Sequence, residues 1–176
     1  MEKLYTICIF TENTLGLLNR ISGIFTRRRI NIESLSVSET ERKGVSRFTI
    51  VIKSDERERV EKIVRQIRKI IEVLAVFGYE DHDLTYNELA FFKVDAEKSA
   101  GVKELLEGYK RAKVLFEDQR ILIIEKAGTE EEIYAFFSRL KPFGILEFVR
   151  SGRIALPNNE KGLAQYLPEV DWEYYM

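Results

Sequence analysis

The chain has 176 residues, enough for one ordinary domain or two small ones, and its 45% hydrophobic residues suffice for a packed core. Charged residues make up 32% of the chain but nearly cancel to a net charge of −1, whereas a general nucleic-acid binder usually carries a strong basic excess. The single cysteine excludes an internal disulfide framework, and no apolar run approaches the roughly 18–20 residues that a membrane-spanning helix needs.

The lone cysteine, Cys8, lies in an alternating apolar stretch that predicts a strand. A buried small hydrophobe is therefore expected at this position rather than a reactive thiol. The chain shows no signal-peptide pattern before this strand begins at Leu4. Together with a lone thiol, which suits a reducing compartment, this predicts a soluble cytoplasmic protein.

Alternating and helical spacings of apolar residues divide the first half of the chain into six elements. Between residues 60 and 71, isoleucine and valine recur at helical spacing with charged residues between them, which is typical of an amphipathic helix. The predicted elements are a strand at 4–10, a helix at 14–28, strands at 32–39 and 47–52, a helix at 54–71 and a strand at 72–79. This order, β-α-β-β-α-β, is the ferredoxin-like pattern.

The second half repeats this order with different residues. Thr129 is placed as a helix cap ahead of three glutamates, which suit the positive end of a helix. The predicted elements are a strand at 89–94, a helix at 102–109, strands at 113–117 and 120–126, a helix at 130–140 and a strand at 145–149. The predicted fold class is therefore α+β, with two ferredoxin-like domains whose antiparallel sheets carry helices on one face and are open on the other.

The polar segment between the halves predicts the domain boundary. We expect a first domain at 1–80, a linker at 81–87, a second domain at 88–156 and a tail at 157–176. The only histidine, His82, lies in the linker and is expected to be an exposed loop residue, because a metal site needs three or four ligands of fixed geometry. For the aromatic residues of the tail, packing back on the protein or fraying is favoured over docking on a partner.

The turn at residues 13–16, between the first strand and the first helix, is expected to present free backbone N–H groups at a helix N-terminus. Such an end carries roughly half a positive charge and attracts carboxylates and phosphates. The amide of Asn13 can both donate and accept, so the turn suits a small zwitterion or anion. On the residues alone, the alternative in which Asn13 only caps the helix and Gly16 only permits the turn is favoured.

The basic run at 27–29 is interpreted as a solvated helix end rather than a phosphate site.

The sequence carries no motif for catalysis. It has no Gly-rich phosphate loop, no Cys/His metal cluster and no Ser-His-Asp arrangement with its elbow glycines. A non-catalytic protein is therefore expected. A stand-alone amino-acid-binding module that controls another protein, and an enzyme on the same scaffold, remain as alternatives. A transcription factor would need a DNA-binding element, and no helix-turn-helix with a basic face is evident.

Three segments of the first half stand at distinctive distances from one another: Glu12-Asn13-Thr14-Leu15-Gly16, Arg20-Ile21-Ser22-Gly23-Ile24-Phe25 and Asn31-Ile32-Glu33-Ser34-Leu35. With them the sequence closely resembles the small, regulatory subunits of acetolactate synthase (acetohydroxyacid synthase), and its first half resembles an ACT domain, an amino-acid-sensing module. The resemblance covers about residues 1–156. It continues through Lys110-Arg111-Ala112, Ala127-Gly128-Thr129 and Arg150-Ser151-Gly152.

The resemblance implies a non-catalytic subunit that activates a large catalytic subunit and confers feedback inhibition by valine in branched-chain amino-acid biosynthesis. Thiamine diphosphate, Mg²⁺ and FAD are then cofactors of the catalytic partner, and no cofactor or metal is expected in this chain. A homodimer through the ACT domains is expected, and neither a nucleic acid nor a membrane as partner. We expect the first domain to carry dimerisation, activation and effector binding, and the second domain to transmit inhibition.

The resemblance also implies an effector site, because valine in the family lies between two ACT domains of a dimer. Asn13 and Gly16 match the turn residues of that site, and Asn31 matches an asparagine contributed across the dimer. The backbone N–H groups of Leu15 and Gly16 are expected to face the valine carboxylate. The apolar candidates for the isopropyl group are Leu17 and Ile30.

Two positions depart from the family pattern. Arg29 stands where the family usually has glycine, and Leu15 stands where it often has proline or a small polar residue. If the turn at Arg29 needs a positive φ, a residue with a Cβ is strained there by about 1–2 kcal/mol.

Overall fold

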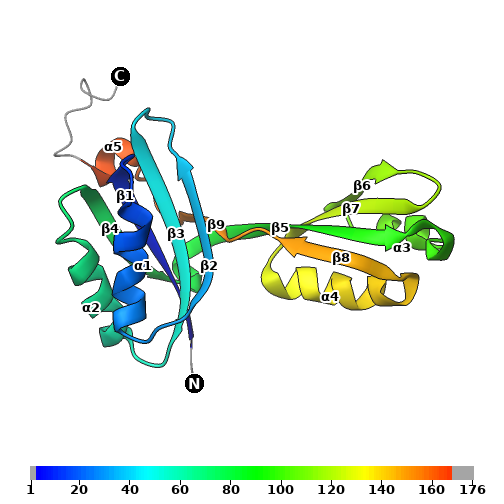
Figure 1. Ribbon diagram of the computed structural model, residues 1–176, viewed down its shortest axis with the longest axis horizontal. Coiled ribbons are helices and arrows are strands. Elements are labelled where there is room, and N and C mark those ends of the chain that lie inside the picture. The colour runs from blue at the N-terminus through cyan, green and yellow to red at the C-terminus, as the bar shows by residue number, and fades with distance from the viewer. Residues whose placement is uncertain (1–2, 168–176) are drawn as a thin grey trace. The chain divides into compact units, whose positions relative to one another are not determined.

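The computed structural model describes residues 3–167, which form two compact units (Figure 1). Unit 1 contains the chain up to Thr85 and the segment from Arg153 onward, and unit 2 is Tyr86–Gly152. The tryptophan and the last two tyrosines of the expected tail lie outside the described residues.

These units differ from the expected domain boundaries in two places. Residues 81–87, expected as a linker, form a short 3₁₀ helix, η1 (Asp81–Asp83), that leads directly into strand β5 (Leu84–Asp95). Residues 153–156, expected in the second domain, belong to unit 1. The reason is a set of contacts with the first strand, described below, that has no local signature in the sequence.

Unit 1 has the predicted β-α-β-β-α-β order and an antiparallel sheet with the strand order β2-β3-β1-β4. Both helices lie on the same face of this sheet (Figure 1). The prediction of fold class is confirmed. The elements are β1 (Lys3–Glu12), α1 (Leu17–Arg27), β2 (Ile32–Glu39), β3 (Val45–Ser54), α2 (Arg57–Ile67) and β4 (Val73–Glu80).

The core of unit 1 follows the two periodicities of the sequence. Alternate residues of β1 point to the helices, and the apolar stripes of α1 and α2 meet them, so that Ile7, Ile21 and Ile63 are fully buried. Full burial of one such side chain contributes about 1.5–3 kcal/mol. Helix α1 begins at Leu17 rather than at residue 14, because Gly16 has a left-handed conformation with a φ of 78° and cannot belong to a right-handed helix.

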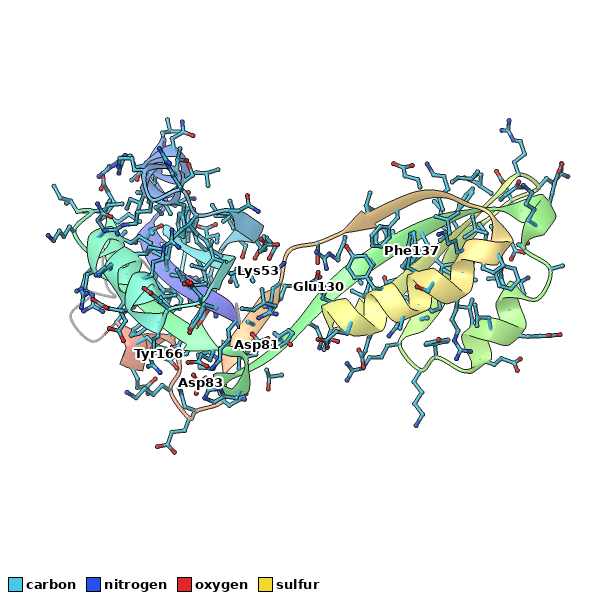
Figure 2. All side chains as sticks on the ribbon, turned by 90° about the horizontal axis from the view of Figure 1, so that it is seen from below. Lys53, Asp81, Asp83, Glu130, Phe137 and Tyr166 are labelled. Carbon is cyan, nitrogen blue, oxygen red and sulfur yellow. The ribbon has the colours of Figure 1, made fainter. Side chains whose placement is uncertain are left out.

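The other face of the unit 1 sheet was expected to be open, and this prediction is wrong. Strand β9 (Ile154–Pro157) and helix α5 (Leu163–Tyr166), neither of which was predicted, cover it. The ring of Tyr166, which is labelled in Figure 2, lies 5.2 Å from that of Phe77. Leu167 is buried in the same cluster as Phe10.

A buried arginine fixes this segment to the sheet. Arg153 is 1% exposed, and its guanidinium donates to the hydroxyl of Thr6 at 2.9 Å and to the carboxylate of Asp81 at 2.6 Å. Its backbone carbonyl accepts a hydrogen bond from Ser36 on β2. Because Thr6 lies on β1 with its side chain opposite the helices, Arg153 anchors the C-terminal segment across the middle of the sheet.

Cys8 lies on the same covered face and is buried, as predicted. Burial raises the pKa of its thiol, and the nearby guanidinium of Arg47 only partly opposes that shift. A thiol whose pKa is raised by burial is a poor nucleophile, so Cys8 acts as a small core residue.

Unit 2 repeats the topology, with the strand order β6-β7-β5-β8. Its core is rich in aromatic residues, with the ring of Phe92 4.9 Å from that of Phe148 and 5.3 Å from that of Phe136. The elements after β5 are α3 (Val102–Glu107), β6 (Ala112–Glu117), β7 (Ile121–Gly128), α4 (Glu130–Leu140) and β8 (Ile145–Arg150). Two 3₁₀ turns, η2 (Ala96–Lys98) and η3 (Lys141–Phe143), join them.

Candidate functional site

The turn between β1 and α1 is anchored at its start and open at its tip. The N–H of Asn13 donates to the carbonyl of Gly44 at 2.8 Å, and the N–H of Thr14 donates to the carbonyl of Glu12 at 3.1 Å. Residues 13–16 are all exposed, and Leu15 is completely so. The turn therefore holds a fixed position while its side chains face solvent.

The N-terminus of α1 is free of any cap from the chain itself. No side chain caps it, and its first turn contains no acidic residue. A Cβ built on Gly16 would meet no atom within 4 Å beyond its chain neighbours, so this side of Gly16 is open. Backbone N–H groups and the helix dipole together make such an end suitable for a carboxylate.

The cation one turn into α1 does not alter this picture. This residue, Arg20, pairs with Glu72 at 2.5 Å. The hydrogen bond from Arg20 lowers the pKa of Glu72, so the pair is charged and internally neutralised at neutral pH. The attraction for an anion at this end thus comes mainly from the helix itself.

The C-terminal end of α1 forms a Schellman motif. The N–H of Ile30 donates to the carbonyl of Phe25 at 3.1 Å, and the N–H of Arg29 donates to the carbonyl of Thr26 at 3.0 Å. Arg29 has a φ of 53° and is the one non-glycine residue with positive φ in the part of the chain that the structure describes. The condition for strain is therefore met, at a cost of about 1–2 kcal/mol.

Asn31 follows this motif at the opposite end of α1 from Gly16. Its side chain is exposed and donates to the carboxylate of Glu33 at 3.3 Å. Because an 11-residue helix is about 16 Å long, one chain cannot bring Asn13 and Asn31 to the same small ligand. The two asparagines can share a ligand only if a second copy of the chain supplies one of them.

Leu17 and Ile30, the two candidates for contact with the isopropyl group, differ in their burial. Leu17 is 2% exposed and lies in the core of unit 1, so only its backbone faces the turn. Ile30 is partly buried against the same core. The apolar side chain that reaches solvent at the turn is Leu15.

Gly44 takes part in the turn and was not expected to. Its carbonyl accepts from Asn13, and it has a φ of 81° between β2 and β3. The register of β1 against β3, which pairs Glu12 with Val45, brings it there. The sequence shows Gly44 only as part of a charged turn, so the pairing of the strands was the missing signal.

Residues 3–167 give no support for a metal site or a membrane-spanning helix. That part of the chain contains no cluster of three potential metal-ligating His, Cys, Asp or Glu side chains. His82 lies on η1 with its side chain 74% exposed beside Asp83. None of the helices described is long and apolar enough to span a membrane.

Two family models match the chain in succession. A model for the acetolactate synthase small-subunit-like ACT domain matches residues 7–75, and a model for the small subunit of acetolactate synthase matches residues 87–159. A probable acetolactate synthase small subunit from Archaeoglobus fulgidus is 36% identical over 159 residues, covering 89% of this chain and 98% of that protein. The chain belongs to the acetolactate synthase small-subunit family.

Further relatives of the small-subunit family agree. The acetolactate synthase small subunit of Bacillus subtilis is 35% identical over 157 residues, covering 88% of this chain and 90% of that protein. The crystal structure of the small subunit from Thermotoga maritima superposes with a TM-score of 0.81 at 26% identity, over 90% of this chain and 99% of that one. The resemblance derived from residues 12–35 is therefore confirmed, together with the ACT fold of the first unit.

Proposed function

We propose that this chain is the regulatory subunit of an acetolactate synthase. It binds a catalytic subunit, raises its activity and makes it sensitive to valine. The proposal is supported by membership of the small-subunit family and by the uncapped, solvent-open N-terminus of α1 in unit 1. Thiamine diphosphate, Mg²⁺ and FAD would belong to the catalytic partner.

The turn at 13–16 is suited to the polar end of valine. The carboxylate would accept hydrogen bonds from the N–H groups of Leu15 and Gly16, and the helix dipole would favour its negative charge. The side-chain oxygen of Asn13 would accept from the ammonium group. A zwitterion taken out of water needs such a partner for each polar atom, because an unpaired buried polar group is costly.

The site would be completed by a second copy. Asn31 of that copy would lie across from Asn13, and Ile30 of that copy and Leu15 would contact the isopropyl group. Strand β2, which begins directly after Asn31, is an edge strand of its sheet and has one side free for pairing. A two-fold pairing of two such edges would use the same surface on both copies.

The two units would divide the work. Unit 1 would carry the activating contact and the effector site, and unit 2 would transmit inhibition. Because residues 153–167 complete unit 1, this division is best tested in the full chain and not in a fragment that ends near Asp83.

Reconstitution with the catalytic subunit from the same organism tests the proposal. We expect the purified chain alone to form no acetolactate from pyruvate, to raise the turnover of the catalytic subunit, and to make that turnover fall as valine is added. Sedimentation is expected to show a dimer at micromolar concentration. Failure to bind or activate the catalytic subunit would instead favour a stand-alone amino-acid-sensing module that controls another protein.

A further inference from the structure

The two helices of unit 1 form a strongly basic layer on a chain that is nearly neutral. Residues 16–31 and 56–71, which contain α1 and α2 with their ends, carry ten of the 28 Lys and Arg but only three of the 29 Asp and Glu. The two helices lie side by side on one face of the sheet (Figure 1). We call the exposed side of these two segments the basic layer.

Most of this charge has no acidic partner within the described chain. Ion pairs reach Arg20, Arg57 and Lys62 of the ten basic residues, and the other seven have no described carboxylate within 4 Å. Several of the seven bond neutral acceptors, as Arg28 does to Gln66 and Arg59 does to the carbonyl of Arg28. Like charges one turn apart repel each other, so the layer is kept at some cost to the isolated chain.

A groove of mixed character lies along the two helices. It has a volume of about 260 Å³, and its lining combines Ile24 and Ile70 with the polar side chains of Arg20, Arg27, Gln66 and Lys69. Next to it in the chain, Ile71 is 93% exposed. Isoleucines among cationic side chains fit an apolar side chain carried on an acidic surface.

We propose that the basic layer is the surface on which this chain docks an acidic patch of its catalytic subunit, with an apolar side chain of that patch seated in the groove between α1 and α2. This inference rests on the proposed function and names the surface that it uses. The uncompensated cations would steer the encounter and match the opposite charge of the partner. The groove residues Arg27 and Lys69 are not among those proposed to hold valine, so docking and valine binding can be measured separately.

Two other partners could in principle occupy the basic layer. One is a nucleic acid, which also complements its charge, and the other is a second copy of this chain. Binding of a nucleic acid would give the isoleucines at the groove no role, because a phosphate backbone is bound by cations and polar groups. A second copy is expected at the β2 edge instead, which leaves the helix side for a different protein.

The test is a double charge reversal at the groove, Arg27→Glu with Lys69→Glu, the first at the end of α1 and the second just after α2. Both side chains are exposed and neither has an ion pair in the structure. The matched control is Lys43→Glu with Lys161→Glu, which changes the charge equally on exposed residues of unit 1 outside the two helices. Each protein is titrated into the catalytic subunit at low and high salt, and the concentration for half-maximal activation is measured.

We expect the double reversal to raise the half-maximal concentration by about tenfold or more at low salt and to flatten its dependence on salt. The control should behave as wild type, and both variants should bind valine with unchanged affinity, which shows that unit 1 is folded. Replacing the exposed apolar residue, Ile71→Ser, should weaken activation by a factor that salt does not alter.

The outcomes separate this inference from the proposed function. If wild type activates and the double reversal activates equally well, the inference is overturned while the proposed function stands. If wild type does not bind the catalytic subunit at all, the proposed function fails first. A fluorescent oligonucleotide that binds wild type but not the double reversal, or a change in sedimentation of the variant, would assign the layer to another partner and also overturn the inference.

Discussion

The two units of this chain share one topology and differ in what their helices expose. In both, the first helix starts after a left-handed glycine, Gly16 with a φ of 78° and Gly101 with a φ of 89°. A Cβ on Gly16 would meet nothing within 4 Å, whereas one on Gly101 would touch the ring of Phe143 at 3.5 Å. The same turn is therefore open in unit 1 and covered in unit 2.

The later helix of unit 2 makes the contrast sharper. Helix α4 has a capping box, in which Thr129 accepts from the N–H of Glu132 and the carboxylate of Glu132 accepts from the N–H of Thr129. Three glutamates occupy its first turn. A helix end already satisfied by its own carboxylates does not need an external anion. On the proposed function, unit 1 would owe its ligand site to the lack of such capping side chains rather than to a different backbone.

The sheet faces opposite the helices also differ. In unit 1 this face is covered by β9 and α5, while in unit 2 the paired residues Phe91 and Val149 are 37% and 51% exposed. The covering segment depends on Arg153. Four predictions test these contrasts.

Arg153→Ala should have the largest effect. It removes the buried partner of an ion pair whose carboxylate, Asp81, is partly exposed, and it leaves the buried hydroxyl of Thr6 without its donor, so unit 1 should lose about 3 kcal/mol of unfolding free energy. Hydrogen exchange should show faster exchange in β1 and β3 and unchanged exchange in β7 of unit 2. Equal loss of protection in both units would show that the anchor is not specific to unit 1.

Gly16→Asp should come next, with a loss of valine affinity of at least about a hundredfold, roughly 2.7 kcal/mol. It places a negative charge where the carboxylate is proposed to lie, and activation of the catalytic subunit should persist. Gly101→Asp introduces the same residue at the same backbone conformation in unit 2 and serves as the control. Calorimetry with the isolated chain measures both, and equal valine affinities would place the effector site elsewhere.

Asn13→Ala should weaken valine binding by about tenfold to a hundredfold, because a hydrogen bond to a charged group contributes about 1.5–3 kcal/mol. Asn19→Ala, an exposed asparagine on the same helix, is the matched control and should leave the affinity unchanged. A valine titration of the reconstituted enzyme reports both variants. A parental inhibition curve for Asn13→Ala would mean that Asn13 only shapes the turn.

Arg29→Gly should have the smallest effect, a gain of about 0.5–1 kcal/mol in unfolding free energy. The substitution relieves the strain of a Cβ at positive φ. Part of that gain is offset because glycine has more conformational entropy in the unfolded chain. Unit 2 already has glycine, Gly144 with a φ of 75°, where its α4–η3 segment ends. Arg28→Gly, at a position with a negative φ of −93°, should lower the melting temperature instead, and the reverse order in a thermal scan would contradict the strain argument.

Most of the fold was predictable because its elements have local causes. Strand β2 lies at the predicted 32–39 and α4 at the predicted 130–140, since alternation and a Thr-Glu cap act within a few residues. The errors fall at helix starts and in the connecting segments. Helix α1 was predicted three residues too long at its start, because apolar spacing does not reveal that Gly16 is left-handed.

The candidate site was predictable as a set of residues and not as an arrangement. The turn at 13–16 and Asn31 stand out in the sequence, but only the structure shows them at opposite ends of α1. Only the structure shows that Leu17 turns into the core and Leu15 into solvent. Helical periodicity tells which face of a helix a residue lies on only once the first residue of that helix is known. The sequence placed the start of α1 at residue 14, three residues too early.

By itself, the sequence determined the two β-α-β-β-α-β repeats and the motifs that identify the family, because each depends on residues close together in the chain. The structure decided that the turn at Arg29 has a positive φ. The tertiary structure alone decided that the C-terminal segment returns to unit 1. That return depends on a hydrogen bond between Arg153 and Thr6, which are 147 residues apart, and on the carbonyl of Ala155 accepting from Arg47. Such pairs leave no periodic signal in either segment, because each partner looks like an ordinary polar residue until the sheet brings the two together.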